Sequence, residues 1–380
     1  MVTPEREWGG VRTTGGLTGV TVCCFGHYDR DYARNRIVRK ALRRAGAEVV
    51  EVWEGSSPWF WRNRALLRDA RLASFDAMVV GFPGYSDMPL ARLVCSRRGV
   101  PLVFDPFVSQ FDTHTADRRK VAPASVRGRF LYHLDRIACR LADLVILDTE
   151  AHRRYFADHV GVSLERSAVV PVGADDEELE PTPEPPTPPF RVAFYGTYMP
   201  LHGADVVVRA AQRVGVLAPD IRFVMIGRGQ TLPAVRDYVR RADVKNVELV
   251  DRVDRRTLRR LLADAHVCLG IFGTTGKATR VVPNKVYDGM SLARAVVTAD
   301  TEAAREMLVH DEHALLIPPG NAAALADAVL RLRDDDALRH RIAAGGRELF
   351  IEHAGIDALS LRLTELLVGL GVKPKATAPS

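Results

Sequence analysis

Short apolar runs alternate with longer segments of helical periodicity along almost the whole chain. Each run has the length and composition of a buried strand. Near-continuous apolar strands separated by helices are typical of parallel sheets that helices cover on both faces. The runs are residues 19–25, 47–53, 76–82, 101–105, 143–148 and 167–173, followed by 190–196, 221–227, 246–251, 266–272, 294–298 and 313–318.

The sequence PTPEPPTPP at residues 181–189 divides this pattern near its middle. Proline lacks the N–H that a sheet requires, so this stretch favours a stiff linker. We therefore predict an α/β fold of two Rossmann-like domains, whose parallel sheets face each other across a cleft. The predicted parts are a loose tail at 1–17, a first domain at 18–180, the linker, a second domain at 190–355, and a segment at 356–380 whose helix would cross back to the first domain.

Composition narrows the class of protein. The net charge of +6 is a modest excess that suits anionic substrates, and we expect no nucleic-acid partner. No apolar run is long enough to span a membrane, and the first 20 residues lack a signal-peptide core, so we expect a cytoplasmic protein. The five cysteines lie in apolar segments and form no CxxC pair, so we expect reduced core residues.

Residues 281–298 read VVPNKVYDGMSLARAVVT and carry the strongest functional signal. A loop with a proline and an amide opens a helix, and a helix N-terminus with its free N–H groups favours phosphate. Asn284 and Lys285 lie in the first turn, where the lysine adds a point charge. Asp288, one turn later, is placed to accept hydrogen bonds from ribose hydroxyls. An ordinary amphipathic helix with a good first turn explains the same residues equally well.

The carboxyl ends of other predicted strands in the second half carry further candidates. Gly196 and Thr197 end the first strand, where glycine permits close approach of a ligand to the backbone. His202 follows just before the next helix. Arg228 stands at the tip of a second glycine turn, and residues 273–277, GTTGK, form a third glycine loop.

In the first half, the predicted strand 101–105 runs into the polar loop PFVSQFDTHTADRR. Carboxylates at the carboxyl end of a strand are suited to recognise hydroxyl groups. Helix capping by Asp117 and solvent exposure of His114 are simpler explanations that stay open. The acceptor-side candidates are Asp105, Asp112, His114 and Asp117, with His27, Arg30 and Asn35 from the loop at residues 26–36.

With these motifs, the chain resembles the GT-B glycosyltransferases, specifically the large retaining family four, over roughly residues 18–355. The segments ADLVILDTEAHRRYF, VVPVGAD and IPPGNAAALADAVLRLRDDDALRHRIAAGGRELF carry this resemblance together with the glycine turns. Three positions depart from the family pattern. His202 replaces the lysine of a Lys-Gly pair, Arg280 replaces the first acidic residue of a pair spaced eight apart, and Asp288 replaces the second, usually glutamate. Lys285 matches a subset with a Pro-x-Lys loop.

The resemblance implies transfer of a sugar from a nucleotide-diphosphate donor to a hydroxyl acceptor, with retention. The acceptor could be a cell-surface glycan, a lipid-linked molecule or a small natural product. Arg228, Arg280 and Lys285 would stabilise the departing diphosphate. The sequence offers no Asp-x-Asp motif or histidine cluster, so we expect neither a metal nor a cofactor. The residues that would hold the donor are Gly196, Thr197, His202, Asn284 and Asp288.

Two alternatives stay open: a UDP-sugar epimerase on the same fold, and a non-catalytic pseudo-transferase that only binds nucleotide sugar. The sequence leaves the oligomeric state open as well. Residues 57–72, SPWFWRNRALLRDARL, combine aromatic and basic side chains. They fit a peripheral membrane contact, and equally a surface helix whose aromatic side chains lie in the core.

Overall fold

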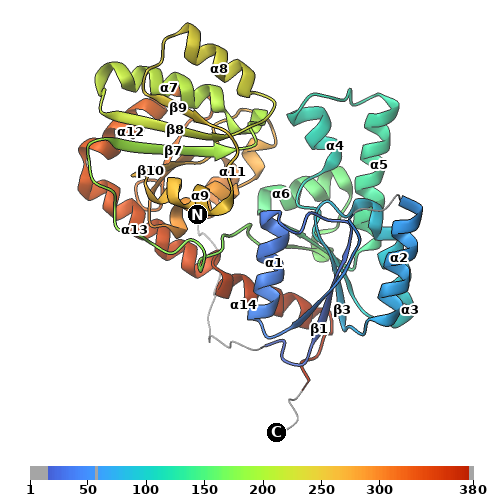
Figure 1. Cartoon of the computed structure of the whole chain (residues 1–380). Helices are drawn as coiled ribbons and strands as arrows, with labels where there is room; N and C mark the ends of the chain where they lie inside the picture. Colours follow the sequence, from blue (N-terminus) through green and yellow to red (C-terminus); the bar gives the residue numbers. More distant parts are fainter. Residues whose placement is uncertain (1–15, 56–58, 376–380) are drawn as a thin grey trace, which may run out of the picture.

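The computed structural model describes residues 16–55 and 59–375 of the 380-residue chain (Figure 1). It contains two six-stranded sheets, and every strand pairing within them is parallel. The prediction of an α/β fold with two Rossmann-like domains is confirmed. Each of the predicted apolar runs contains one strand.

The first sheet has the strand order β2-β1-β3-β4-β5-β6. Its strands are built from valine, leucine, isoleucine and cysteine, which suits strands that are buried on both faces. The strands are β1 (Thr21–Gly26), β2 (Glu48–Trp53), β3 (Ala77–Val80), β4 (Leu102–Phe104), β5 (Leu144–Leu147) and β6 (Ser167–Val169).

Helices cover both faces of the first sheet. One apolar cluster lies under α1 and α14, and a second lies under α2, α3 and α5. The helical segments of this domain are α1 (Ala33–Arg44), α2 (Trp59–Leu72), η1 (Tyr85–Asp87), α3 (Met88–Arg98), α4 (Gln110–Asp112), η2 (Thr113–Asp117), α5 (Val126–Leu141), α6 (Glu150–Tyr155), η3 (Phe156–Val160) and η4 (Leu164–Arg166).

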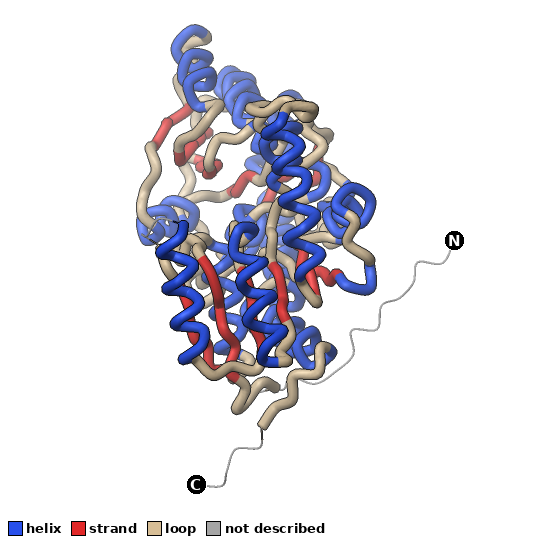
Figure 2. Tube along the Cα trace, turned by 90° about the vertical axis from the view of Figure 1, so that its right-hand side faces the viewer, coloured by secondary structure: helices blue, strands red, loops and turns tan. Residues whose placement is uncertain are grey.

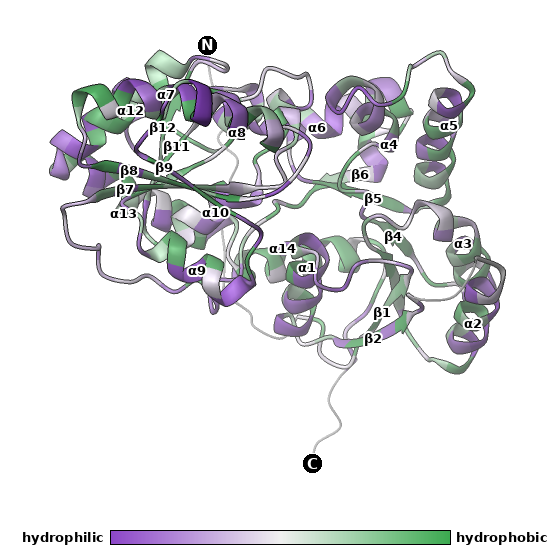
Figure 3. Ribbon diagram, turned by 45° about the horizontal axis from the view of Figure 1, so that its top comes forward, coloured by the Kyte–Doolittle hydropathy of each residue, from purple (hydrophilic) through white to green (hydrophobic). Residues whose placement is uncertain are grey.

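The second sheet has the order β12-β11-β10-β7-β8-β9. The largest apolar cluster of the described residues fills the space between this sheet and helices α7 and α12. Figure 3 shows the strands of both sheets as predominantly hydrophobic. The strands are β7 (Phe190–Gly196), β8 (Ile221–Gly227), β9 (Val247–Val250), β10 (Val267–Leu269), β11 (Ala295–Ala299) and β12 (Leu315–Ile317).

Helices alternate with strands through the second domain as far as α12, and α13 follows α12 directly. Helix α7 begins after the loop that follows β7, and α10 begins after the loop that follows β10. Both loops contribute residues to the candidate site. The helical segments are η5 (Pro200–His202), α7 (Ala204–Leu217), α8 (Leu232–Arg241), α9 (Arg255–Ala263), η6 (Ala278–Arg280), α10 (Asn284–Ser291), α11 (Glu302–Arg305), α12 (Ala322–Asp334) and α13 (Asp336–His353).

Two segments connect the domains. The proline-rich stretch at residues 181–189 lies against the second domain. There, Arg294 donates to the carbonyl oxygens of Thr182 and Pro183. Helix α14 (Ile356–Gly369) packs against α1 of the first domain, and Arg362 donates to the carbonyl oxygen of Val169. The chain therefore returns to the domain in which it began.

The first domain starts earlier than the sequence suggested. Leu17 is fully buried in the cluster under α1, and its N–H donates to the carbonyl oxygen of Ala45 at 2.8 Å. Leu17 therefore belongs to the folded domain and not to the predicted tail. Residues 1–15 of that tail lie outside the described residues.

Candidate functional site

The carboxyl end of β7 meets the first turn of α10 at Gly196. This glycine has a φ of 155°, and a Cβ there would lie 2.8 Å from the His202 ring and 3.0 Å from Lys285 Nζ. Any larger residue would fill this space. The fold therefore brings three predicted donor-side residues, Gly196, His202 and Lys285, to one point, which we call the β7–α10 cradle.

Lys285 is the main charge of the cradle. It is buried, and its Nζ has no hydrogen-bond partner among the described residues, although it lies 4.8 Å from the centre of the Phe194 ring. Burial lowers the pKa of Lys285 to about 7, although the Asp288 carboxylate acts in the opposite direction. A buried cation without a partner is costly, so the position is suited to an anion that arrives from solution.

His202 is the second polar group of the cradle. It is buried, and its Nδ1 has no hydrogen-bond partner among the residues that the structure describes. Burial, together with the charges of Lys285 and Lys277, holds the pKa of His202 well below its usual range. His202 is therefore a neutral ring that can donate or accept a hydrogen bond but does not replace a lysine as a charge.

Asp288 follows Lys285 by one helical turn. The Tyr195 hydroxyl at the end of β7 donates to its carboxylate. Burial raises the pKa of Asp288 to about 6, although the Tyr195 hydrogen bond and the charges of Arg36 and Lys285 oppose this shift. Asn284 begins α10 and is half-buried. Lysine, amide and carboxylate thus occupy the first two turns of one helix, beside the cradle.

Arg228 lies at the rim of the same sheet edge. It is exposed, and its Nε is 4.0 Å from an Asp251 carboxylate oxygen. The glycine turn that carries it packs against the β7 loop, because a Cβ at Gly229 would lie only 1.7 Å from the carbonyl oxygen of Thr197. Thr197 is also exposed. Arg228 and Thr197 therefore border the cradle on its solvent side.

Arg280 of the second domain is held by two residues of the first domain. Its guanidinium donates to the Asp112 carboxylate at 2.7 Å and stacks 4.0 Å above the Tyr155 ring, both in the first domain. The first domain thus already neutralises this charge. A direct role of Arg280 toward a diphosphate stays a prediction, and the observed geometry assigns it to the contact between the domains.

Lys277 is a site residue that the sequence candidates did not include. It is buried, and its Nζ donates to the Thr113 hydroxyl of the first domain at 2.7 Å. Burial lowers the pKa of Lys277 to about 8, although Asp117 and Asp112 act in the opposite direction. The signals were its position in the glycine loop at 273–277 and the rarity of lysine in this arginine-rich chain.

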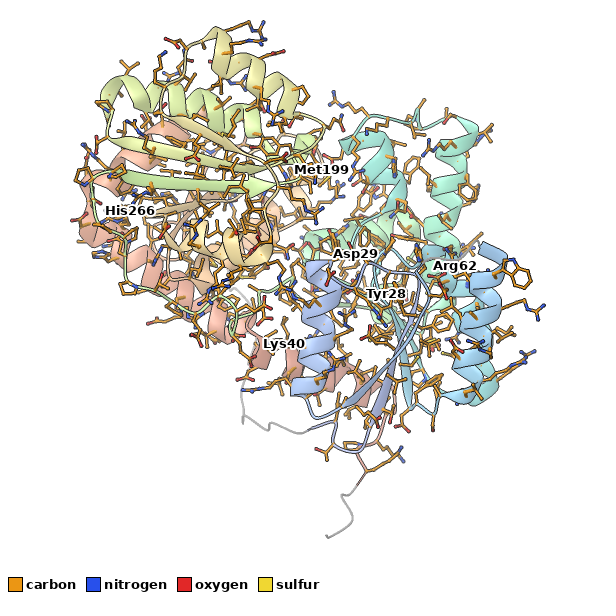
Figure 4. All side chains as sticks on the ribbon, in the orientation of Figure 1. Tyr28, Asp29, Lys40, Arg62, Met199 and His266 are labelled. Atoms are coloured by element: carbon orange, nitrogen blue, oxygen red, sulfur yellow. The ribbon has the colours of Figure 1, made fainter. Side chains whose placement is uncertain are left out.

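Asp117 joins the two domains at the same place. One of its carboxylate oxygens accepts from the N–H of Leu201 and from the Thr275 hydroxyl, each at 3.1 Å. Close by, Arg118 lies 3.2 Å from the sulfur of Met199. Figure 4 shows Met199 at the edge of the second domain that faces α4. The α4–η2 segment of residues 110–117 therefore contacts two loops of the second domain.

The other acceptor-side candidates lie in three different places. His114 is half-buried in η2, and burial together with the Arg118 charge lowers its pKa. Asp105 forms a buried ion pair with Arg34 at 2.7 Å, and Asn35 donates to the carbonyl oxygen of Phe82 at 2.7 Å. These last two residues hold the loops at the end of the first sheet in place.

His27 and Arg30 lie toward the edge strand β2. The His27 ring is 3.0 Å from the carbonyl oxygen of Glu54, and Arg30 pairs with Glu51 at 3.1 Å and stacks on Trp53. Of the predicted acceptor-side set, the structure therefore places Asp112, His114 and Asp117 on the segment that contacts the second domain. Within residues 16–55 and 59–375, no three His, Cys, Asp or Glu side chains gather as a metal site.

Two family models match this chain. The model described as "Glycosyl transferase 4-like domain" matches residues 17–173, and the one described as "Glycosyl transferases group 1" matches residues 189–335. The fold and these matches define a GT-B glycosyltransferase, and the chain belongs to that class.

Curated relatives share modest identity. The chain is 26% identical over 248 residues to a phosphatidyl-myo-inositol mannosyltransferase of Mycobacterium leprae, covering 64% of this chain and 62% of that enzyme. It is 23% identical over 348 residues to the alpha-D-kanosaminyltransferase of Streptomyces kanamyceticus, covering 85% of this chain and 84% of that enzyme. The chain thus spans less than two thirds of the mycobacterial relative.

Solved structures share the fold. An Anabaena protein, HepE, solved with UDP-glucose, superposes with a TM-score of 0.71 at 15% identity, covering 92% of this chain and all of that one. The sucrose-phosphate synthase of Thermosynechococcus elongatus gives a TM-score of 0.71 at 14% identity, covering 93% of this chain and 99% of that one.

Proposed function

We propose that this protein transfers a sugar from a nucleoside-diphosphate donor to a hydroxyl group, with retention of configuration, and that the donor diphosphate binds in the β7–α10 cradle. The observation that carries this proposal is the buried, unpartnered Nζ of Lys285 beside Gly196. A diphosphate supplies the negatively charged partner that this ammonium lacks. HepE, a structural neighbour, was solved with UDP-glucose, which supports a nucleotide-sugar donor.

The chemistry assigns a role to each part of the cradle. The acceptor oxygen forms a bond to the anomeric carbon as the bond from that carbon to the β-phosphate oxygen breaks. The acceptor's proton passes to the departing phosphate. Lys285 and the N-terminus of α10 stabilise the negative charge that develops on this phosphate. Because these groups already provide positive charge, we propose that no metal is needed.

The remaining donor contacts follow from the geometry. Asp288, oriented by the Tyr195 hydroxyl, would accept hydrogen bonds from the ribose. The neutral His202 would donate a hydrogen bond to a phosphate oxygen or to the sugar. The exposed Arg228 would reach the nucleotide from the rim. Lys285 thereby takes over the charge that a lysine at position 202 would bring in the family pattern.

The acceptor would meet the α4–η2 segment. Asp112, His114 and Asp117 lie there, opposite the donor loops, so a hydroxylated acceptor bound to them would stand close to the donor sugar. The relatives named above include an enzyme for a phosphatidyl-inositol and one for an amino sugar, so lipid-linked and small-molecule acceptors are both candidates. The epimerase and binding-module alternatives are not favoured, because these relatives are named as transferases.

Turnover of mass-tagged sugar nucleotides tests the proposal. With a matching donor and a hydroxyl acceptor, the wild-type protein should release nucleoside diphosphate and a tagged product, and Lys285→Met should lose most of this activity. Conversion of the donor sugar without an acceptor would show an epimerase. Tight binding of a donor without any turnover across a broad acceptor panel would show a binding module.

A further inference from the structure

Helices α2, α3 and α5 form the outer layer of the first domain, on the sheet face opposite α1 and α14. Their inner sides contribute to one apolar cluster, in which Leu66, Ala91 and Ala138 are buried. Figure 1 shows this layer at the edge of the molecule remote from the second domain, and Figure 2 views the molecule from that side. The outer sides of these helices form the exposed surface of the α2–α3–α5 layer.

Helix α5 has two apolar stripes where a surface helix needs one. The inner stripe is buried against the domain. The outer stripe contains Val126, Phe130, His133 and Ile137, whose spacing of four, three and four residues keeps them on one face. Val126 is 77% exposed, Phe130 61% and Ile137 53%. Solvated helix faces seldom carry such a stripe, so it indicates a binding partner.

The neighbouring helices extend this surface. Trp61 on α2 is 60% exposed, with the Arg64 guanidinium 5.7 Å from its ring centre, and Leu72 at the end of α2 is 82% exposed. On α3, which packs between α2 and α5, Leu93 is also exposed. Figure 3 shows hydrophobic and hydrophilic residues mixed along α2 and α5.

The charged residues of these three helices are nearly all basic. Residues 118–134 contain no acidic residue. The aspartates of the three helices are Asp69, paired with Arg68 at 2.7 Å, and Asp135, which is buried. The exposed cations of this surface are Arg64, Arg68, Arg71, Arg97, Arg98, Arg119, Lys120, Arg127, Arg129 and Arg140.

The positive charge of this surface distinguishes between two possible binding partners, a second copy of the chain and an anionic lipid surface. A second copy of the chain, joined face to face, would bring arginines against arginines, because a two-fold interface places the same surface on both sides. An anionic lipid surface instead accepts the arginines at its phosphates and the aromatic and aliphatic side chains at the headgroup boundary. We propose that the α2–α3–α5 layer, with Phe130 and Val126 at its tip, docks this protein onto an anionic membrane.

The docking surface is joined to the acceptor side of the site. Asp135 lies on the inner face of α5 and accepts from the N–H groups of Gln110 and Phe111, which begin the α4–η2 segment. The Phe111 ring also packs on Tyr132 of α5, with ring centres 5.6 Å apart. Resting on the proposed function, this link would hold the acceptor segment close to a lipid surface, where a lipid-linked acceptor is located.

Co-sedimentation with vesicles tests the inference without using activity. The full-length protein should bind vesicles of equimolar phosphatidylglycerol and phosphatidylcholine, bind phosphatidylcholine alone at least tenfold more weakly, and lose binding as salt is raised. Phe130→Ser should weaken partitioning roughly tenfold, and Arg129→Glu roughly fivefold or more. The matched controls are Val216→Ser, 81% exposed on α7, and Arg240→Glu on α8, which should bind as the wild type does.

Equal binding by Phe130→Ser, Arg129→Glu and the controls would overturn the inference, as would absence of wild-type binding to the anionic vesicles. A wild-type dimer in sedimentation velocity that Phe130→Ser converts to monomer would overturn it in favour of a second copy. Nucleotide binding, measured without lipid on the same variants, should be unchanged. A failure of vesicle binding is therefore distinguishable from a failure of the donor site.

Discussion

Lys285 is a cation kept in an unfavourable environment, and this gives it a measurable signature. With a pKa of about 7 in the free protein, it is mostly neutral at pH 8. A bound diphosphate favours the charged form. Binding of a nucleoside diphosphate at pH 8 should therefore take up a proton, seen as a binding heat that depends on the ionisation enthalpy of the buffer. Lys285→Met should lose this dependence, and an equal dependence in both proteins would contradict the assignment.

The same residue should affect the stability of the free protein. The pKa of this lysine is lowered from 10.5 to about 7 in the folded protein, so its charged form destabilises the fold. This destabilisation is complete below pH 7 and decreases as the pH rises toward 10.5. Lys285→Met should therefore raise Tm by a few degrees at pH 6 and by less at pH 9. Thermal unfolding at the two pH values measures this. A lower Tm at pH 6 would indicate that Lys285 stabilises the free protein.

A third prediction at the residue scale concerns Asp288 and Tyr195. If the carboxylate binds the ribose, Asp288→Asn should weaken binding of the ribonucleotide and should discriminate less against its 2′-deoxy analogue. Tyr195→Phe, which removes the hydrogen bond orienting the carboxylate, should produce a smaller change in the same direction. Titration calorimetry with both nucleotides measures the ratio. An unchanged ratio in Asp288→Asn would show that the residue only packs its helix.

Among the elements, the α4–η2 segment and the loop between β10 and α10 connect the two domains. Lys277 binds Thr113, Thr275 binds Asp117, and Arg280 contributes its pair with Asp112. These contacts join the acceptor side to the donor side. Lys277→Met should therefore lower kcat/KM for transfer by roughly tenfold or more while donor affinity changes little, with Arg240→Met as a control. A loss of donor affinity equal to the loss of kcat/KM would assign Lys277 to the donor site instead.

The elements were the most predictable level of this molecule. Buried parallel strands leave near-continuous apolar runs, so each strand was visible in the sequence. The cradle was partly visible, because glycine, proline and lysine stand out at strand ends. Contacts across the domains were not visible. The glycine loop and the rarity of lysine single out Lys277, but nothing local shows that it contacts Thr113, 164 positions away, or that Arg280 is paired with Asp112.

At the scale of the whole molecule, the proposed reaction requires both domains. The proposed donor residues lie in the second domain and the proposed acceptor segment in the first, and neither domain alone could hold both reactants and exclude water. A fragment of residues 188–355 should bind nucleoside diphosphate but transfer nothing, once circular dichroism has shown that it folds. Tight nucleotide binding by the first domain, with none by a folded second domain, would reverse the assignment of the domains.

The described residues contain no helix long and apolar enough to cross a membrane. The lipid contact proposed for the α2–α3–α5 layer is a contact of its exposed side chains. The donor cradle and that layer lie in different domains, so their effects should be separable. Variants of the layer should change vesicle binding alone, and variants of the cradle should change nucleotide binding alone.

The central claim is that the β7–α10 cradle binds the diphosphate of a sugar nucleotide, and a calorimetric titration tests it most directly. Wild-type protein and Lys285→Ala are titrated with UDP, GDP and TDP, and with the corresponding nucleosides. For the diphosphate that binds, Lys285→Ala should lose about 1.5–3 kcal/mol of affinity, or roughly ten- to a hundredfold, while nucleoside binding stays nearly the same. Equal affinity of the two proteins for that diphosphate would contradict the claim.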